Sequence, residues 1–171
     1  MTISDLNDTE YIPYFKGYID NANGLKLLPG LQSSFDEALL FFQSIDEDKL
    51  SYRYAESKWT IKEIICHLID TERIFCYRAL RFARQDKTVL SGFDENEYVE
   101  YSGADDRTVD SLLEEYKSVR QASIALYNSF SQTTLLSKGV AGSGHVSVRA
   151  LGFLIIGHEK HHIRIIKERY L

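Results

Sequence analysis

Apolar residues recur every three or four positions along most of this chain, the period of helices that bury one face. The period is strongest at 25–48, 60–84, 108–130 and 147–169. A capping box of Thr60 and Glu63 marks one helix start, and Ser147 is suited to cap another. No stretch alternates apolar and polar residues for long enough to predict a sheet. The pattern therefore predicts an all-α fold, a four-helix bundle whose helix order stays open.

Two long connections separate the later helices of this predicted bundle. Residues 85–106 follow the second helix and residues 131–146 follow the third, and both contain glycines. Connections of this length are unusual in a small bundle unless they cover something. We therefore expect both to shape a pocket, with Phe93 and Tyr98 tucked over its open end.

Length and composition favour one domain over residues 1–171, with 1–10 as a loose polar lead and a short helix within 11–22. A net charge of −5 argues against a nucleic-acid partner or an anionic membrane surface. No apolar run approaches the roughly 18 residues of a membrane span. The N-terminus carries no cationic, apolar leader, so we expect a cytoplasmic protein.

The two cysteines are predicted to remain thiols. Cys66 and Cys76 fall ten positions apart on one predicted helix, or about 15 Å along its axis. A disulfide requires Cα atoms within about 7 Å of each other. Free thiols are typical of a reducing compartment.

Three histidines on apolar helix faces are the strongest chemical signal. His158 and His162 are four positions apart and should point the same way, about 6 Å apart along the axis. His67 lies on the inward stripe of the second helix. Buried imidazoles are costly unless they are satisfied, and a divalent ion would satisfy all three. Three protein ligands leave a position for water or substrate, as in catalytic zinc sites. Our hypothesis is a three-histidine metal site inside the bundle.

Simpler interpretations stay open for each residue. A buried histidine is more often a hydrogen-bonded core residue, and a histidine-lined core without metal remains an alternative. The pattern from His158 to His162 also matches the H-E-x-x-H of zinc proteases, whose third ligand usually lies downstream, where little chain remains. Candidates for a catalytic or orienting role are Glu159, His161 and Asp70, although each is also suited to an ordinary helix-surface contact.

Two segments resemble the DinB-like (YfiT-like) superfamily. The first is K-W-T-I-K-E-I-I-C-H-L-I-D-T-E-R at 58–73 with Y-R-A-L-R-F-A-R at 77–84, and the second is G-H-E-K-H-H at 157–162. The resemblance extends from about residue 11 to the C-terminus. It implies a four-helix bundle with a metal held by His67, His158 and His162. Members of the superfamily are often dimers and bind nickel or zinc.

The resemblance also implies a class of chemistry. Characterised relatives include thiol S-transferases that use bacillithiol, mycothiol or glutathione, and others are described as metal-dependent hydrolases. We therefore expect a homodimeric enzyme that presents a metal-bound thiolate or hydroxide to a small electrophilic substrate. The implied cofactors are a divalent zinc or nickel ion and a low-molecular-weight thiol. A non-catalytic metal- or small-molecule-binding bundle is the alternative. Candidates to bind the thiol's carboxylates are Arg73, Arg78, Arg81 and Arg149.

Overall fold

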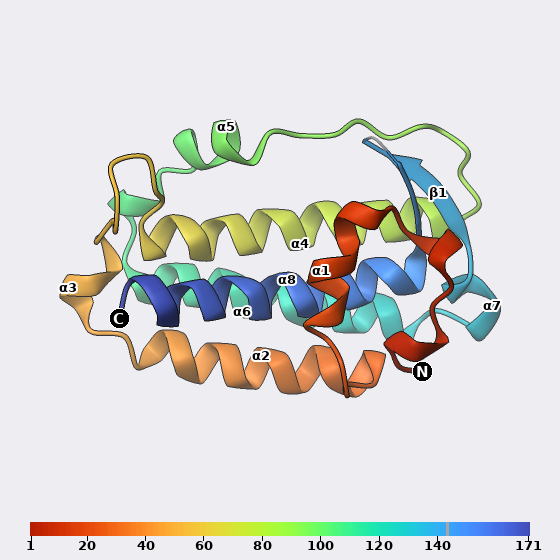
Figure 1. The fold of residues 1–171 in the computed structure, drawn as a ribbon, viewed down its shortest axis with the longest axis horizontal. Helices are drawn as coiled ribbons and strands as arrows, with labels where there is room; N and C mark the ends of the chain where they lie inside the picture. The colour runs from red at the N-terminus through yellow and green to blue at the C-terminus, as the bar shows by residue number, and fades with distance from the viewer. Residues whose placement is uncertain (143) are drawn as a thin grey trace.

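The computed structural model, which describes residues 1–142 and 144–171, confirms the predicted four-helix bundle (Figure 1). Its long helices are α2 (Leu27–Gln43), α4 (Ile61–Ala83), α6 (Val109–Asn128) and α8 (Val148–Arg169). Their bounds lie within a few residues of the predicted stretches. The first stretch ends early, because a turn at residues 44–46 separates α2 from the short α3 (Glu47–Leu50).

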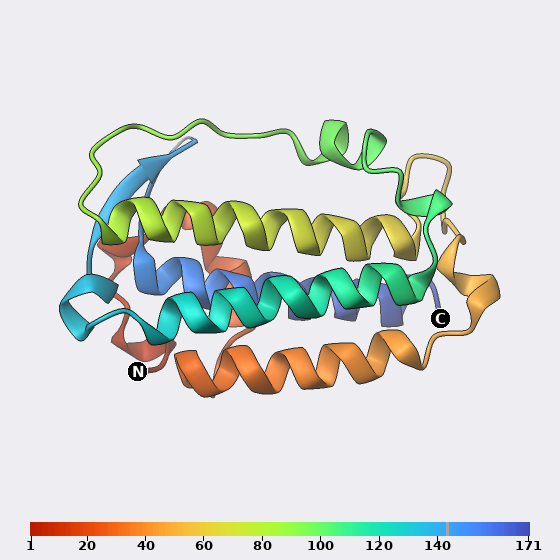
Figure 2. The ribbon, with the colours of Figure 1, turned by 180° about the vertical axis from the view of Figure 1, so that it is seen from behind.

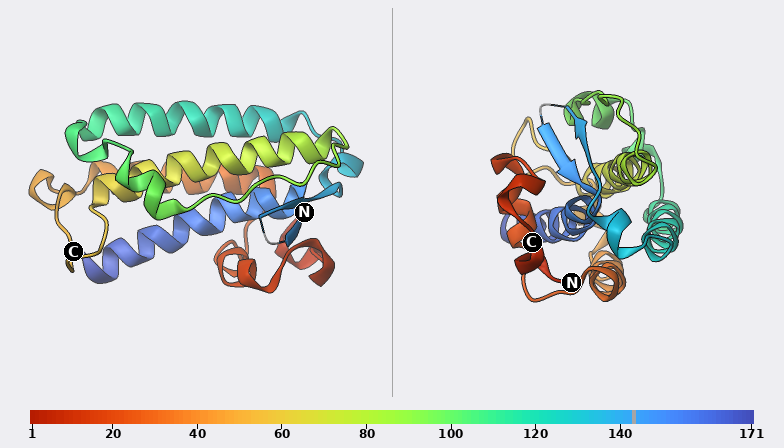
Figure 3. Two further views of the ribbon diagram at one scale, coloured as in Figure 1. Left: turned by 90° about the horizontal axis from the view of Figure 1, so that it is seen from above. Right: turned by 90° about the vertical axis from the view of Figure 1, so that its right-hand side faces the viewer.

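The helix order, which the sequence left open, is not sequential around the bundle. Helix α4 packs against α6 and α8, and α2 packs against the same two helices. Consequently α2 and α4 lie diagonally across the bundle, as the end view shows (Figure 3). Seen from behind, α6 lies in front of α8 and between α2 and α4 (Figure 2). The neighbouring helices α4 and α8 are the two that carry the candidate histidines.

The predicted helix starts are confirmed by their hydrogen bonds. The Thr60 hydroxyl accepts from the Glu63 backbone N–H at 3.1 Å, and the Glu63 carboxylate accepts from the Thr60 N–H at 2.7 Å. Ser147 caps α8 by accepting from the Ala150 N–H at 3.1 Å. Each cap satisfies donors that have no partner within their own helix.

The connection at 131–146 is more structured than predicted. It contains α7 (Gln132–Leu135) and a hairpin of β1 (Lys138–Ala141) paired antiparallel with β2 (Gly144–Ser147). The expectation of no sheet was therefore wrong here, because four-residue strands are too short to show clear alternation. Leu90 joins this hairpin to the other long connection, donating to the Val140 carbonyl at 3.0 Å and accepting from the Gly142 N–H at 2.9 Å.

The connection at 85–106 runs along the outside of the bundle (Figure 1). It contains α5 (Glu95–Glu100) and a 3₁₀ turn, η4 (Ala104–Asp106). Asp94 caps α5 by accepting from two backbone N–H groups. Both long connections therefore contain short regular elements.

The N-terminal residues 1–10 are not the loose lead that their polar composition suggested. They form two 3₁₀ turns, η1 (Ile3–Asp5) and η2 (Asp8–Glu10), and Glu10 is buried. The Glu10 carboxylate accepts from Arg149 Nε at 2.7 Å and from the Ser147 hydroxyl at 2.8 Å. Met1, Ile3 and Leu6 of this segment also pack against the core. Polar composition did not reveal this packing, because the segment is held by a few scattered apolar side chains and one buried acid.

The next residues form η3 (Pro13–Phe15) and α1 (Lys16–Asp20), which confirms the short helix predicted within 11–22. Helix α1 crosses α8 (Figure 1). Both cysteines are free thiols, as predicted. Within the described residues, no helix has the combination of length and hydropathy that crossing a bilayer requires.

Candidate metal centre

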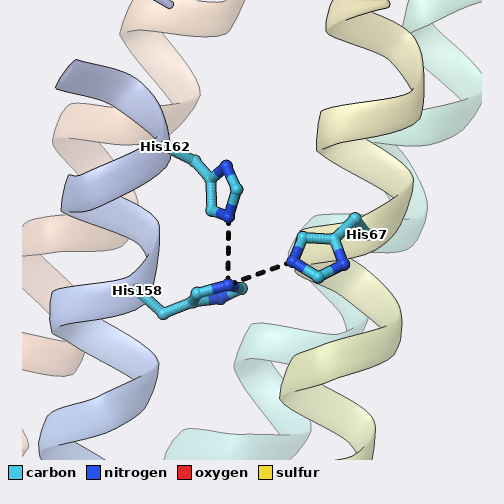
Figure 4. A group of neighbouring side chains, drawn as sticks. All are labelled: His67, His158 and His162. Carbon is cyan, nitrogen blue, oxygen red and sulfur yellow. Dashed lines mark hydrogen bonds between the residues drawn. The ribbon is translucent and has the colours of Figure 1, made fainter. Parts of the chain in front are cut away.

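The three predicted histidines meet between α4 and α8 (Figure 4). His67 Nε2 lies 3.0 Å from His158 Nε2, and His162 Nε2 lies 3.1 Å from the same atom. One ring nitrogen from each residue lies within 4.8 Å of the others. The predicted convergence of the three imidazoles is therefore present in the fold.

Neighbouring side chains hold the His67 ring in this orientation. The Trp59 ring lies 4.7 Å from the His67 ring, centroid to centroid. In addition, Thr71 Oγ1 lies 3.5 Å from His67 Nδ1. Thr71 is one helical turn beyond His67, so both side chains share the inward face of α4. A proton on Nδ1 directed at this hydroxyl leaves the Nε2 lone pair facing the other histidines.

Burial keeps the three imidazoles uncharged near neutral pH. It lowers the pKa of His67 to about 4, because the charged ring would lose its hydration. Burial also lowers the pKa values of His158 and His162 well below the usual range, and repulsion between the rings lowers them further. Neutral imidazole is the form that binds metal ions.

The cluster is poorly satisfied by hydrogen bonds alone. A neutral imidazole nitrogen either donates one proton or offers one lone pair. His158 Nε2 faces two nitrogens at once, so it cannot make a good hydrogen bond with both. Two nitrogens that share a tetrahedral zinc at about 2.0–2.1 Å lie about 3.3 Å apart. The separations of 3.0 and 3.1 Å are close to that value, so the donor set fits a divalent ion.

The histidines lie in the wall of a cavity of about 420 Å³. Most other lining side chains are apolar or aromatic, and both long connections contribute to it, as predicted. The prediction for Phe93 is confirmed, but that for Tyr98 is wrong. Tyr98 is exposed and packs on the Phe93 ring at 5.1 Å from outside the lining. The wall is formed by Ile12, Tyr14, Phe15, Tyr18, Trp59, His67, Thr71, Phe75, Arg78, Gly92, Phe93, Glu95, Ala141, Gly142, Leu154, His158 and His162.

Glu159 does not lie in this cavity wall. It is buried on another face of α8, where its Oε2 accepts from Arg120 at 2.6 Å and from the Tyr116 hydroxyl. One residue of helix rotates a side chain by about 100°, which turns Glu159 away from the imidazoles. The H-E-x-x-H interpretation therefore lacks its general base, and the candidate role of Glu159 in catalysis is not supported.

His161 and Asp70 also lie outside the lining of the cavity. The His161 ring packs on Tyr18 at 5.1 Å between centroids. Asp70 contacts Arg73 at 3.6 Å, and in the described part of the chain no hydrogen bond joins it to an imidazole. The orienting partner of His67 is Thr71 instead, one position along. Its sequence signal was its place four residues after His67 on the same stripe.

Three of the four candidate arginines form ion pairs, and the fourth lines the cavity. Arg73, Arg81 and Arg149 are paired with Glu115, Asp86 and Glu10 respectively. Arg78 alone among the four lines the cavity.

Comparisons with known proteins agree with this fold. A model of the DinB superfamily matches residues 31–166. The solved structure of YfiT from Bacillus subtilis, described as a probable metal-dependent hydrolase with an unusual four-helix bundle topology, superposes with a TM-score of 0.76. The superposition covers 93% of this chain and 91% of that chain at 15% identity, which supports likeness of fold alone. No curated protein matches this chain.

Proposed function

This chain belongs to the DinB superfamily, and from that premise we propose that it is an enzyme whose divalent metal ion is held by His67, His158 and His162. The observation that carries the proposal is the meeting of three uncharged imidazoles in the wall of a cavity large enough for a small substrate. YfiT is described as a probable metal-dependent hydrolase, which agrees with this proposal.

A divalent ion at this position would lower the pKa of a water or thiol bound to it and so supply a nucleophile at neutral pH. The three imidazoles would hold the ion, and Thr71 would fix the tautomer of His67. The aromatic side chains of the wall would exclude bulk water from a small electrophile. The reaction type we propose is hydrolysis or thiol S-transfer, with zinc or nickel as the metal because imidazole suits both.

Metal analysis tests the ligand assignment. Protein purified without chelator should contain about one zinc or nickel ion per chain, since three imidazoles form a chelating site. His67→Ala, His158→Ala and His162→Ala should each lose most of that metal, whereas His145→Ala, at an exposed position on the hairpin, should retain it. Full metal content in His158→Ala would rule out the assignment.

Turnover requires a separate assay. We expect reaction of glutathione with an alkylating electrophile, or hydrolysis of a small ester, to stop on addition of EDTA and to resume when zinc or nickel is restored. The His145→Ala protein should behave like the wild type. Turnover that is unaffected by complete metal removal would contradict the proposal.

One observation favours the alternative of a non-catalytic metal-binding bundle. Glu159, His161 and Asp70 all lie outside the cavity lining, so none is placed to move a proton there. In that case EDTA would lower the melting temperature, but neither thiol nor ester would react. The two functions are thus separated by the turnover assay on protein of proven metal content.

A further inference from the structure

Arg78 is a buried cation in the cavity wall. Only 7% of its surface is exposed, and it lines the same cavity as the three histidines. It lies on α4 eleven residues after His67, so the two share a helix face and are about 16 Å apart along the axis. Thr71 and Phe75 occupy the wall between them.

The partners of Arg78 differ from those of the other buried arginines. Arg120 is paired with Glu72 and Glu159, and Arg149 is paired with Glu10. Among the residues that the structure describes, no carboxylate lies within 4.0 Å of Arg78. Burial therefore lowers its pKa, with no acid to offset the loss of hydration. Even so, a guanidinium remains charged near neutral pH.

The contacts of Arg78 leave most of its donors available. Its Nη2 donates to the Ser91 carbonyl at 3.1 Å, and its guanidinium carbon lies 5.8 Å from the centre of the Phe93 ring. A guanidinium carries five N–H donors in a planar fork, and the described residues accept from one. A buried charge without a counter-ion is costly, so a ligand anion is the partner that would offset this cost.

We propose that Arg78 binds a carboxylate of the small-molecule substrate, at the end of the cavity away from the imidazoles. Ligands would then lie along α4 with the reacting group at the histidines and the anionic group at Arg78. A single carboxylate matches the planar fork and balances its single charge. This inference rests on the proposed function for the reacting end only, because the anion site does not require the metal.

The test uses the chain's single tryptophan, Trp59, which lines the cavity and whose fluorescence reports binding. The probes are phenylbutyrate and its uncharged amide, phenylbutyramide, titrated into EDTA-treated and zinc-loaded protein. We expect the carboxylate to bind about tenfold more tightly than the amide, as a charge-assisted hydrogen bond allows. Added salt should weaken binding of the carboxylate and leave the amide unchanged.

Variants test whether Arg78 is responsible for the preference for the carboxylate probe. Arg78→Gln should reduce the preference for the carboxylate to near unity, and Arg78→Lys should retain part of it. Arg73→Gln, which removes an exposed arginine from the same helix, should retain all of it. Melting curves establish that each variant is folded. If Arg78→Gln does not fold, the Arg78→Lys and salt data on folded protein still decide.

Several results would overturn the inference. These are equal affinity of wild type for both probes, an unchanged preference in Arg78→Gln, or no saturable binding of phenylbutyrate. If Arg78→Gln weakened the binding of both probes by the same factor, the inference would also be overturned. Such a result would mean that Arg78 only anchors the connection at Ser91. The preference of metal-free protein for phenylbutyrate over phenylbutyramide tests the anion site. The metal content of the histidine variants tests the metal centre, so the two proposals can fail separately.

Discussion

His67 presents its two ring nitrogens to two different environments. Nε2 faces His158, and Nδ1 faces the Thr71 hydroxyl. The tautomer that leaves a lone pair on Nε2 is the one able to bind a metal at this position, and it places on Nδ1 a proton that the Thr71 hydroxyl can accept. A side chain that touches no metal can therefore set the affinity of the centre.

Thr71→Val removes this acceptor and keeps nearly the same shape. We expect the affinity for zinc to fall by about tenfold or more, because second-layer partners typically contribute that much. Competition with a fluorescent zinc chelator measures it. Thr133→Val, at an exposed position of α7, is the matched control and should leave affinity unchanged. An unaltered affinity in Thr71→Val would show that the hydroxyl does not orient His67.

At this scale the sequence revealed the histidines but not their supporting contacts. His158 and His162 were recognisable from a spacing of one helical turn, and His67 from its place on an apolar stripe. Which of Asp70 and Thr71 would face His67 depends on the packing of α4 against α8. The lack of an acidic partner for Arg78 among the described residues could not be predicted either, because it depends on where every acid lies in the fold.

The close crossing of helices α1 and α8 depends on Gly157. The Asn21 side chain donates to the Gly157 carbonyl at 3.2 Å, and a Cβ at Gly157 would overlap the Tyr18 backbone carbonyl. Tyr18 also lines the cavity, so this contact fixes one part of its wall.

Gly157→Ala should destabilise the protein by about 1–3 kcal/mol, because an added methyl forces α1 away from α8. Gly17→Ala is the matched control, since nothing lies near its would-be Cβ. That variant should be neutral or stabilising by up to about 1 kcal/mol, as alanine favours helix over glycine. Urea unfolding measures both, and equal stabilities for the two variants would contradict the account of this crossing.

The buried pair of Glu10 and Arg149 makes the N-terminal turns sensitive to acid. Burial alone would raise the Glu10 pKa, but hydrogen bonds from Arg149, Asn7 and Ser147 outweigh it and lower the pKa to about 2. Because the unfolded-state value is near 4.5, the unfolded chain binds the proton first. The stability contributed by Glu10 is present above about pH 4.5 and is lost as the pH falls towards 2.

Glu10→Gln should therefore be less stable than wild type at neutral pH, by about 3 kcal/mol if the buried arginine loses its counter-ion. The difference should shrink between pH 4.5 and 2 as wild-type Glu10 becomes protonated. Urea midpoints over this range measure it, with Asp8→Asn as an exposed control from the same turn. A difference that does not change with pH would show that the charge on Glu10 is not responsible.

The main elements were predictable because long amphipathic helices repeat their signal over many turns. The hairpin at β1 and β2 was not, since four-residue strands carry too few positions to establish a period. The N-terminal turns were missed for a related reason: Glu10 looks like any surface acid until the fold places Arg149 beside it.

For the whole molecule, Arg120 connects all four long helices. From α6 it donates to Glu72 of α4 at 2.8 and 2.9 Å, to Glu159 of α8 at 2.6 Å, and to the Leu31 carbonyl of α2 at 3.0 Å. Burial alone would lower the pKa of Arg120, but the Glu159 and Glu72 carboxylates together outweigh it and raise the pKa well above its usual value. Because Glu159 adjoins His158, this network also fixes the rotation of α8 that turns its histidines towards α4.

Arg120→Met would leave two buried carboxylates without their counter-ion. We expect a loss of about 3–5 kcal/mol and a melting temperature lower by about 10 °C. Arg53→Met removes a partly exposed arginine that bridges Glu63 and Asp105, and should cost at most about 1 kcal/mol. Calorimetry compares the two, and similar losses would contradict a central role for Arg120.

The proposed metal centre requires one ion that is shared by α4 and α8. Anomalous X-ray diffraction from crystals of zinc-loaded protein would locate that ion. We expect one strong peak between the Nε2 atoms of His67, His158 and His162, at the wall of the cavity. A peak at another position would contradict the proposed centre. So would the absence of a peak between the three rings, with the imidazoles still hydrogen-bonded to one another.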